Sequence, residues 1–356
     1  MPVRVVVRAD AVPATGSGHV VRVLGIVDEL RARGVDVVVA GRVEISWVMD
    51  LLAARGLTPV PCPDEALPFL DWCREQGVVA VVLDGYDLDA GLGSTLLAAG
   101  LRVLSMRDGS FGAEQACDIA VDQNLGAERP PHPREGTLLA GPRYTLFRDE
   151  VLEATPVRWE PRHPGPRVLA FFGGSDPFGA AEVLAPVVLD AVAPVDLRVV
   201  TPDLGVADTL RSLPTRQGQA LTVLAPRPDV LSLARGADVV VTATGSSVWE
   251  LMVHGVAFAC VQVADNQELG YRALLSRELG LGLGSLNDLR ENPAAVDLAR
   301  AALVRLCADP ALRATLAERG RGVFDGRGRA RVVDELLQQT TESSEHAARP
   351  AATGAP

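Results

Sequence analysis

Residues 3–40 have the sequence VRVVVRADAVPATGSGHVVRVLGIVDELRARGVDVVVA, and this stretch decides the fold class of the chain. A short apolar run, Val3–Val7, precedes a glycine-containing loop and a stretch from about Gly18 to Arg33 in which apolar residues recur at helical spacing. Gly34 supplies a stop signal for that helix, and Val35–Ala40 is a second apolar run. Strand, helix and strand in this order form the repeating unit of a parallel sheet that is covered on both faces.

The same alternation continues along the chain and divides it into two halves. It predicts further strands at 78–83, 101–105 and 119–121, and then at 167–172, 197–200, 221–224, 239–242 and 257–263. Between Glu128 and Pro166 the pattern gives way to a proline-rich stretch, and 356 residues are enough for two domains with separate cores. We therefore predict an α/β protein of two doubly wound Rossmann-type domains that face each other across a cleft: residues 1–150, a linker at 151–166, residues 167–340, and a disordered tail at 341–356.

Composition excludes several classes of function. All 34 basic residues are arginine, so neither a Walker-type phosphate-binding loop nor a pyridoxal or Schiff-base site can form. The 45 acidic residues give a net charge of −11, which is unlike the basic surface of a nucleic-acid-binding protein.

The sequence also indicates the compartment and the absence of a metal site. No apolar run is long enough to span a membrane and the N-terminus lacks a signal-peptide pattern, so we expect a cytoplasmic protein without nucleic-acid or membrane partners. The five cysteines form no Cys-x-x-Cys pair and the histidines show no metal-binding spacing. We therefore expect reduced thiols, no metal and no cofactor.

The loop after the first strand supplies the first candidate site residues, because doubly wound domains bind ligands outside the carboxyl ends of their strands. It contains Arg8, Asp10 and a turn that leads through Gly18 to His19 at the start of the helix. Free backbone N–H groups at such a helix start suit an anion. A neutral imidazole at His19 can accept a proton from an attacking hydroxyl, water or ring N–H, and a capping or packing role is the alternative. A dinucleotide site is not favoured, because the third glycine of Gly-x-Gly-x-x-Gly is missing.

An acidic segment, Asp84-Gly85-Tyr86-Asp87-Leu88-Asp89, follows the third strand. Asp87 and Asp89 match the Asp-x-Asp pattern that holds a divalent cation in one class of sugar transferases. Sites of this kind need more oxygen ligands than one such pair supplies, so solvated loop acids are the favoured interpretation. Asp84 and Tyr86 are candidates to line the cleft opposite His19.

In the second half, the segment Thr242–Glu250 follows a strand and opens a helix. Gly245, Ser246 and Ser247 can donate N–H and O–H groups to a diphosphate at the positive helix end. Glu250 can accept hydrogen bonds from ribose hydroxyls. The alternative is a plain helix start with a serine cap and a first-turn acid.

Two further strand ends in the second half carry candidate residues. Gly174 and Ser175 follow the first strand of this half, where glycines let the backbone approach a phosphate closely or simply form a strand-to-helix turn. Asn266 and Gln267 follow a later strand, and their amides can bind sugar hydroxyls or an acyl amide, or else cap a helix.

Taken in order, these segments resemble the UDP-sugar hydrolase of the pseudaminic acid pathway and its relatives in spore-coat polysaccharide synthesis. The ordered combination is specific although each piece is weak. The matching residues lie within about residues 1–280 and are Arg8-x-Asp10, Gly16-x-Gly18-His19-x-x-Arg22, Asp84-x-Tyr86-x-x-Asp89, Asp122-Gln123-Asn124, Gly141-Pro142-Arg143-Tyr144-x-Leu146-x-Arg148-x-Glu150, Gly173-Gly174-Ser175-Asp176, Trp249-Glu250 and Asn266-Gln267.

The resemblance implies the two-domain GT-B architecture, with a UDP-sugar on the second domain and metal-independent cleavage at the anomeric carbon. It implies a catalytic histidine at His19, positions near the sugar for Tyr86 and Asn266, and a position beside the ribose for Glu250. Relatives of this family include the cytosylglucuronate synthases of nucleoside-antibiotic biosynthesis, which move a glucuronosyl group from UDP to a ring nitrogen of cytosine.

Departures from the family pattern affect the choice of acceptor. Residues 11–13 are Ala, Val and Pro where the hydrolases carry serines, and residues 178–180 are Phe, Gly and Ala where the family usually shows Asn and Thr. We therefore predict a glycosyltransferase that passes a sugar from UDP to a small acceptor, and a hydrolase that uses water is the alternative. The arginines available to an anionic sugar are Arg8, Arg22, Arg143 and Arg148. An inactive nucleotide-sugar-binding protein and a UDP-sugar epimerase are less favoured, because His19 is retained and histidines are few.

Overall fold

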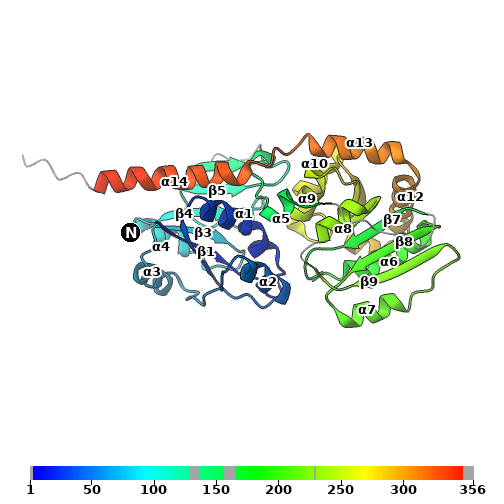
Figure 1. Ribbon diagram of the computed structural model, residues 1–356, viewed down its shortest axis with the longest axis horizontal. Coiled ribbons are helices and arrows are strands. Elements are labelled where there is room, and N and C mark those ends of the chain that lie inside the picture. The colour runs from blue at the N-terminus through cyan, green and yellow to red at the C-terminus, as the bar shows by residue number, and fades with distance from the viewer. Residues whose placement is uncertain (1–2, 129–135, 156–164, 228–229, 348–356) are drawn as a thin grey trace, which may run out of the picture.

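Valine-rich strands build two parallel sheets in the computed structural model, which describes residues 3–128, 136–155, 165–227 and 230–347. Figure 1 shows the two sheets side by side, each with its own covering helices. Alternate residues of one strand enter different cores, because successive strand side chains point to opposite faces. Val5 and Val7 pack into one cluster of buried residues and Val6 into another. Both faces of the first sheet are therefore buried.

The first sheet has six parallel strands among the described residues. They are β1 (Arg4–Ala9), β2 (Asp36–Ala40), β3 (Ala80–Asp84), β4 (Arg102–Met106), β5 (Ile119–Asp122) and β6 (Thr137–Ala140), in the spatial order β2-β1-β3-β4-β5-β6. The helices of this domain are α1 (Gly18–Ala32), α2 (Ser46–Ala54), α3 (Ala66–Glu75) and α4 (Leu92–Ala98). The apolar stripe of α1 is buried, as its spacing predicts. The chain turns just after the helix at Gly34, which adopts a φ of +76°.

The second sheet also has six parallel strands in the described part of the chain. They are β7 (Arg167–Phe171), β8 (Val195–Val200), β9 (Gln219–Leu224), β10 (Val239–Ala243), β11 (Phe258–Gln262) and β12 (Leu281–Ser285), in the order β12-β11-β10-β7-β8-β9. Its helices are α6 (Ala180–Ala191), α7 (Leu204–Arg211), α8 (Val230–Gly236), α9 (Ser246–Val253), α10 (Glu268–Ser276), α11 (Leu286–Glu291), α12 (Pro293–Ala308) and α13 (Pro310–Arg321).

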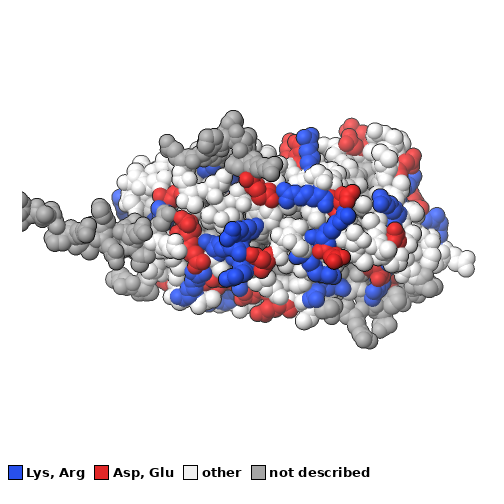
Figure 2. All heavy atoms as spheres, turned by 90° about the horizontal axis from the view of Figure 1, so that it is seen from above, with Lys and Arg blue, Asp and Glu red and all other residues white. Residues whose placement is uncertain are grey.

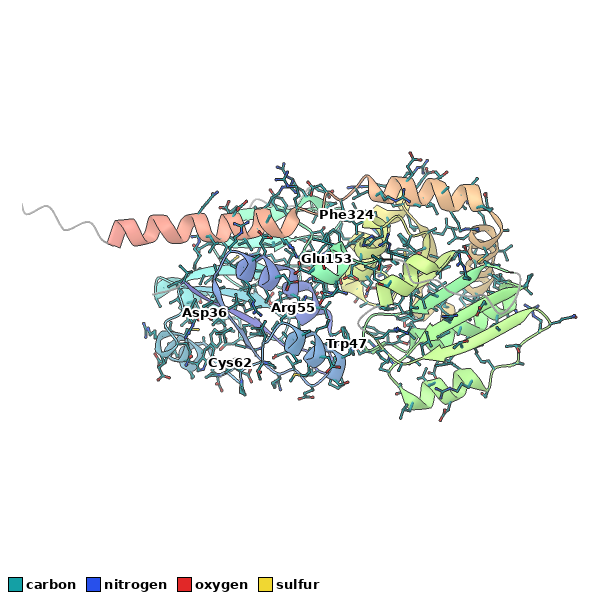
Figure 3. The ribbon with its side chains drawn as sticks, viewed as in Figure 1. Asp36, Trp47, Arg55, Cys62, Glu153 and Phe324 are labelled. Atoms are coloured by element: carbon teal, nitrogen blue, oxygen red, sulfur yellow. The ribbon has the colours of Figure 1, made fainter. Side chains whose placement is uncertain are left out.

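Short helical segments lie at the junction of the domains. They are η1 (Pro142–Tyr144) and α5 (Asp149–Leu152), while η2 (Asp265–Gln267) precedes α10. Phe324 lies at this junction and packs edge-on against Phe147, with ring centroids 5.5 Å apart (Figure 3). Within the predicted linker, residues 156–164 lie outside the described residues.

The last helix, α14 (Gly328–Ala347), crosses back to the first domain. Its Val332, Val333 and Leu336 are buried in the cluster that also holds Val5 and Val23, and Figure 1 shows the helix beside β4 and β5. The prediction that residues 167–340 form one domain is therefore wrong at its C-terminal end. The predicted tail is also wrong where α14 continues beyond residue 340, and its residues 348–356 lie outside the described residues.

The strand order fixes where a ligand can bind. In the first sheet β2 lies on one side of β1 and β3 lies on the other, so the direction in which strands are added reverses at β1. In the second sheet β8 and β10 lie on opposite sides of β7, so the same reversal occurs there. Doubly wound sheets bind ligands at such switch points, outside the carboxyl ends of the strands. His19 follows β1 and Asp84 ends β3, whereas Gly174 follows β7 and Gly245 follows β10. The predicted site residues therefore flank both switch points.

The surface carries charges of both signs. In the view of Figure 2, arginine side chains lie beside Asp and Glu side chains over both domains. Within the described ranges, no helix combines the length and the apolar character that crossing a membrane requires. The cysteines are all free thiols.

Candidate active site

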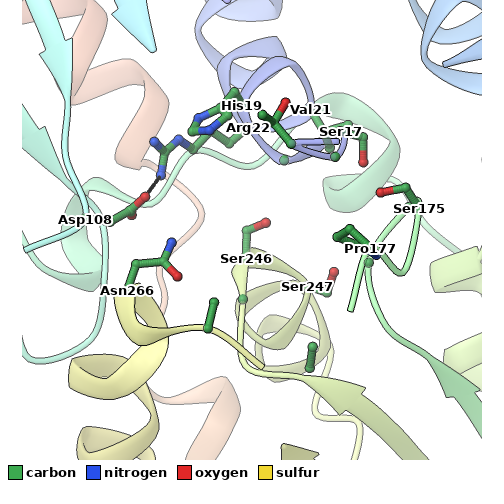
Figure 4. Close-up of a pocket in the computed structure, with 18 of the residues that line it drawn as sticks. Ser17, His19, Val21, Arg22, Asp108, Ser175, Pro177, Ser246, Ser247 and Asn266 are labelled. Carbon is green, nitrogen blue, oxygen red and sulfur yellow. Dashed lines mark hydrogen bonds and ion pairs between the residues drawn. The ribbon is translucent and has the colours of Figure 1, made fainter. Parts of the chain in front are cut away.

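A cavity of about 720 Å³ opens between the two domains, and loops from both sheets line it. Its walls include most of the residues that the sequence indicated. These are Arg8, Asp10, Gly18, His19, Tyr86, Gly174, Ser175, Gly245, Ser246, Ser247, Glu250, Asn266 and Gln267. Figure 4 shows His19 on one side of the cavity and Ser246 and Ser247 across from it.

His19 is held by a buried carboxylate. Its Nδ1 lies 2.7 Å from Oδ1 of Asp84, and Asp84 is fully buried at the end of β3. The prediction that Asp84 lines the cleft and binds substrate is therefore wrong, because its side chain lies behind His19. Burial alone would raise the pKa of Asp84, but Arg22 and His19 outweigh it and hold that pKa below its ordinary value. An ionised Asp84 can only accept, so Nδ1–H of His19 donates to it, and in the neutral ring Nε2 is then the nitrogen that carries the lone pair.

Arg22 joins this pair to a second buried carboxylate. Its Nε and Nη2 each donate to Asp84 at 2.6 Å, and its Nη1 donates to both oxygens of Asp108 at 2.8 Å (Figure 4). Desolvation would raise the pKa of Asp108, but the Arg22 charge keeps it low. Charge-assisted bonds of this kind are strong and directional. Arg22 therefore fixes Asp84, and through it the ring of His19.

Asp108 in turn fixes an aromatic hydroxyl at the domain boundary. The Tyr86 hydroxyl donates to Asp108, and Nδ2 of Asn266 in the second domain donates to the Tyr86 oxygen at 3.0 Å. Burial and the neighbouring Asp108 carboxylate raise the pKa of Tyr86. The Tyr86 ring lies 4.6 Å from the His19 ring at an interplanar angle of 85°. The residues expected near the sugar thus connect the two domains beside His19.

A second charged group lies at the carboxyl end of β1, within the strand and in the loop that follows it. Arg8 is buried, and it donates to Asp10 at 2.6 Å and to Asp64 at 2.9 Å. The Asp10 carboxylate also accepts from the backbone N–H of Arg42 at 2.6 Å. Asp10 therefore positions Arg8 and the neighbouring loop at this wall of the cavity.

The glycine turn after β7 brings the two domains into contact. The indole Nε1 of Trp47 donates to the Gly174 oxygen at 3.2 Å, and Trp47 lies at the edge of the first domain that faces the second (Figure 3). A Cβ at Gly174 would collide with Trp47 and with Ser17. Gly174 is therefore required for close approach of the loops, and the adjacent Ser175 lines the cavity.

The start of α9 faces the cavity from the second domain. Gly245 is its extended N-cap and offers no side-chain cap, so the first N–H groups of the helix keep donor capacity for a ligand. Glu250 lines the cavity one turn further on and pairs with Arg148 of the junction. The amide oxygen of Gln267 accepts a hydrogen bond from the Val263 N–H at 2.9 Å.

The acidic segment after β3 uses the Asp89 carboxylate to hold the chain. Asp89 accepts from the backbone N–H groups of Ala66 at 3.0 Å and Gly91 at 2.8 Å, so both of its oxygens are used to hold loops and helix starts. Asp87 is exposed at the rim of the cavity. Among the described residues, no group of three or more His, Cys, Asp or Glu could hold a metal ion.

Some site residues were not predicted from the sequence, and one predicted cation is misplaced. Asp108, Trp47 and Phe111 all line the cavity. Asp108 follows β4 just as Asp84 ends β3, so position at a strand end is the signal that could have found it. Arg143 is exposed and does not line the cavity, so the prediction that it is available to an anionic sugar is wrong.

Comparisons with known proteins identify the fold. No protein-family model matches the chain, and no curated protein matches it. MurG of Acinetobacter baumannii matches with a TM-score of 0.65 at 16% identity, over 95% of this chain and 100% of that one. The glycotransferase of kitacinnamycin matches with a TM-score of 0.66 at 16% identity, over 95% and 99%. Glycosyltransferase VinC, solved in complex with DTDP, matches with a TM-score of 0.61 at 15% identity, over 95% and 100%.

These matches confirm the predicted fold class, which is the two-domain GT-B architecture. The molecule is thus a GT-B protein with a carboxylate-held histidine at its interdomain cavity. At these identities the similarity shows the fold alone. The resemblance to the pseudaminic acid and spore-coat family stays a prediction.

Proposed function

We propose that this protein is a glycosyltransferase that displaces UDP from the anomeric carbon of a UDP-sugar and passes the sugar to a small acceptor. One observation carries the proposal: the His19–Asp84 pair faces the N-terminus of α9 across a single cavity. A base on one side and anion-binding N–H groups on the other are the two parts that such a displacement needs. Structures of the same fold that are described as glycosyltransferases support it.

His19 is the general base of the proposed reaction. Its Nδ1–H is directed at Asp84, so Nε2 can take the proton from the acceptor while the acceptor atom bonds to the anomeric carbon. Asp84 then stabilises the imidazolium that forms, as a buried carboxylate does in Ser-His-Asp triads. Arg22 keeps Asp84 ionised and in place.

The second domain receives the leaving group. As the bond between the anomeric carbon and the diphosphate oxygen breaks, the electron pair passes to UDP. The N–H groups and hydroxyls at Gly245, Ser246 and Ser247 stabilise the developing charge at the positive end of α9. Glu250, held by Arg148, accepts hydrogen bonds from the ribose hydroxyls.

The ion pairs that line the cavity indicate whether a neutral or an anionic donor sugar fits it. Glucuronosyl transfer to cytosine is the specific reaction that the family resemblance suggests, and it needs a cation for the sugar carboxylate. Arg8 and Arg22 are each bound to two aspartates, and Arg148 pairs with Glu250. A donor with a neutral sugar fits this arrangement better than UDP-glucuronate.

A panel of UDP-sugars tests the proposal. The purified protein is incubated with neutral UDP-sugars and with UDP-glucuronate, each with and without small acceptors that include cytosine, and the products are resolved by mass. We expect a glycosylated acceptor together with UDP. Complete release of free sugar and UDP with no acceptor present would show instead that water is the acceptor and that the protein is a hydrolase.

A further inference from the structure

An aromatic wall stands beside His19 on the acceptor side of the cavity. Tyr86 and Phe111 both line the cavity, with ring centroids 5.5 Å apart and an interplanar angle of 51°. Tyr86 is in turn packed edge-on against His19. Leu88 lines the cavity next to them. A molecule lying against this wall would have its reactive atom close to the base.

Phe111 is held out toward the cavity by a tight turn. The backbones of Asp108 and Phe111 exchange two hydrogen bonds of 3.1 Å, and Gly109 and Gly112 adopt φ values of +64° and +73°. The N–H of Gly109 also donates to Asp122 at 2.8 Å, which ties the turn to β5. Phe111 nonetheless stays 39% exposed. A large apolar ring that is fixed in this way and exposed to a cavity can bind an apolar part of a ligand.

The charges around this wall select against an anion. The cavity-lining arginines of the first domain and its junction are each within 4.0 Å of a carboxylate: Arg8, Arg22, Arg42 and Arg148. Asp87, next to Tyr86, lines the same region and is exposed. A negatively charged acceptor would therefore meet an exposed carboxylate beside Tyr86, and the buried cations of Arg8 and Arg22 are already paired with aspartates.

We propose that the acceptor is a planar, uncharged aromatic or heteroaromatic molecule that packs against Phe111 and presents an O–H or a ring N–H to Nε2 of His19. This inference rests on the proposed function and names its acceptor class. In the transfer, the acceptor O or N bonds to the anomeric carbon, its proton passes to His19, and the bond to the diphosphate breaks with its electron pair going to UDP. Stacked and edge-to-face ring contacts favour such an acceptor over a saturated alcohol of the same size.

The test uses the purified full chain, a UDP-sugar and matched acceptors. Phenol is compared with cyclohexanol to test for the ring, and 4-hydroxybenzamide is compared with 4-hydroxybenzoate to test for the charge. Cytosine and uracil supply heteroaromatic N–H acceptors. We expect glycosides of phenol, of 4-hydroxybenzamide or of the pyrimidines, and little or none of cyclohexanol and 4-hydroxybenzoate. Equal use of cyclohexanol or of the benzoate would overturn the inference.

Variants of Phe111 make the test specific to the wall. Phe111→Ala should raise the acceptor KM about tenfold, the loss expected for one ring contact, whereas Phe111→Tyr keeps the ring and should retain the wild-type KM. Leu67→Ala is the control, since Leu67 is 68% exposed and lies outside the cavity. An unchanged acceptor KM in Phe111→Ala would overturn the inference.

Measuring UDP release distinguishes a wrong acceptor class from a wrong proposed function. If the protein cleaves a UDP-sugar but prefers saturated or anionic acceptors, only the acceptor class is wrong. If it cleaves none of the UDP-sugars under any condition, the proposed function fails and the acceptor inference fails with it.

Discussion

The two sides of the cavity are built from the same strand–turn–helix unit but carry different chemistry. In the first domain the turn between β1 and α1 ends in His19, and behind it lie Asp84, Arg22 and Asp108 in a buried ionic network. In the second domain the turn between β10 and α9 ends in Ser246, and the uncharged Thr244 behind it donates to the backbone oxygen of Val261 at 3.1 Å. This difference is the basis for assigning proton transfer to the first domain and stabilisation of the leaving diphosphate to the second in the proposed reaction.

Replacing Arg22 by methionine removes the cation of the buried network and should have the largest effect on stability. The substitution leaves the Asp84 and Asp108 carboxylates buried without their shared cation. Removing one partner of a buried ion pair typically costs about 3–5 kcal/mol, so the free energy of unfolding should fall by about that amount. Urea denaturation at pH 7 measures it.

Arg74→Met is the matched control, because Arg74 forms an exposed ion pair with Asp71 and its side chain is 60% exposed. An exposed pair should be worth less than about 1 kcal/mol. Equal losses in the Arg22 and Arg74 variants would contradict a structural role for the buried network.

Lowering the pH should reduce the stabilisation that the buried ion pairs of the first domain provide. Burial alone would raise the pKa values of Asp84 and Asp108, but Arg22 holds both below their ordinary value. Because the folded pKa is lower than the unfolded one, the stabilisation is complete above about pH 4 and is lost as the pH falls through the lowered folded values. The stability gap between the wild type and Arg22→Met should therefore shrink from pH 5 to pH 3 in urea titrations. A gap that stays constant would refute this assignment.

Glu250→Gln tests the binding role assigned to the second domain. Hydrogen bonds to a charged group contribute about 1.5–3 kcal/mol, so the Kd for UDP should rise about tenfold or more. Calorimetry with UDP and with 2′,3′-dideoxyuridine diphosphate separates the causes. The wild type should prefer UDP, and the variant should bind the two nucleotides almost equally. A retained preference for UDP in the variant would exclude Glu250 from the ribose contact.

The smallest effect is expected at Asp89, which lines the cavity but belongs neither to the buried ionic network nor to the start of α9. Its carboxylate holds the N–H groups of Ala66 and Gly91, so Asp89→Asn should cost about 1 kcal/mol of unfolding free energy or less, as a helix cap does. Activity should stay within about twofold of the wild type, and EDTA should change it little. Strong inhibition by EDTA would restore the Asp87/Asp89 cation site as an explanation.

Much of the fold could be predicted because its strands are buried apolar runs. The predicted strands coincide with β1–β5 and β7–β11 to within about two residues. The two missed strands lack that signal: β6 is a four-residue strand in a proline-rich stretch, and β12 contains Gly282 and Gly284. The return of α14 to the first domain could not be predicted, since helical periodicity shows that a face is buried but not which sheet covers it.

The candidate site was predictable where chemistry follows a strand end, and not where it depends on long-range pairing. His19, Glu250 and Asn266 were found because each lies just beyond a strand. Arg22 and Asp108 are 86 residues apart in the sequence, and no local pattern predicts their contact. The burial of Asp84 was missed for the same reason, because it depends on how α1 covers the end of β3.

In the proposed reaction His19, oriented by Asp84, removes the acceptor proton. The most direct measurement compares kcat/KM for sugar transfer in the wild type and in His19→Ala, with the Kd for UDP as the control for folding and donor binding. We predict a loss of at least about 100-fold in kcat/KM with an unchanged Kd, in line with removal of a general base. Wild-type activity in His19→Ala would exclude His19 as the base.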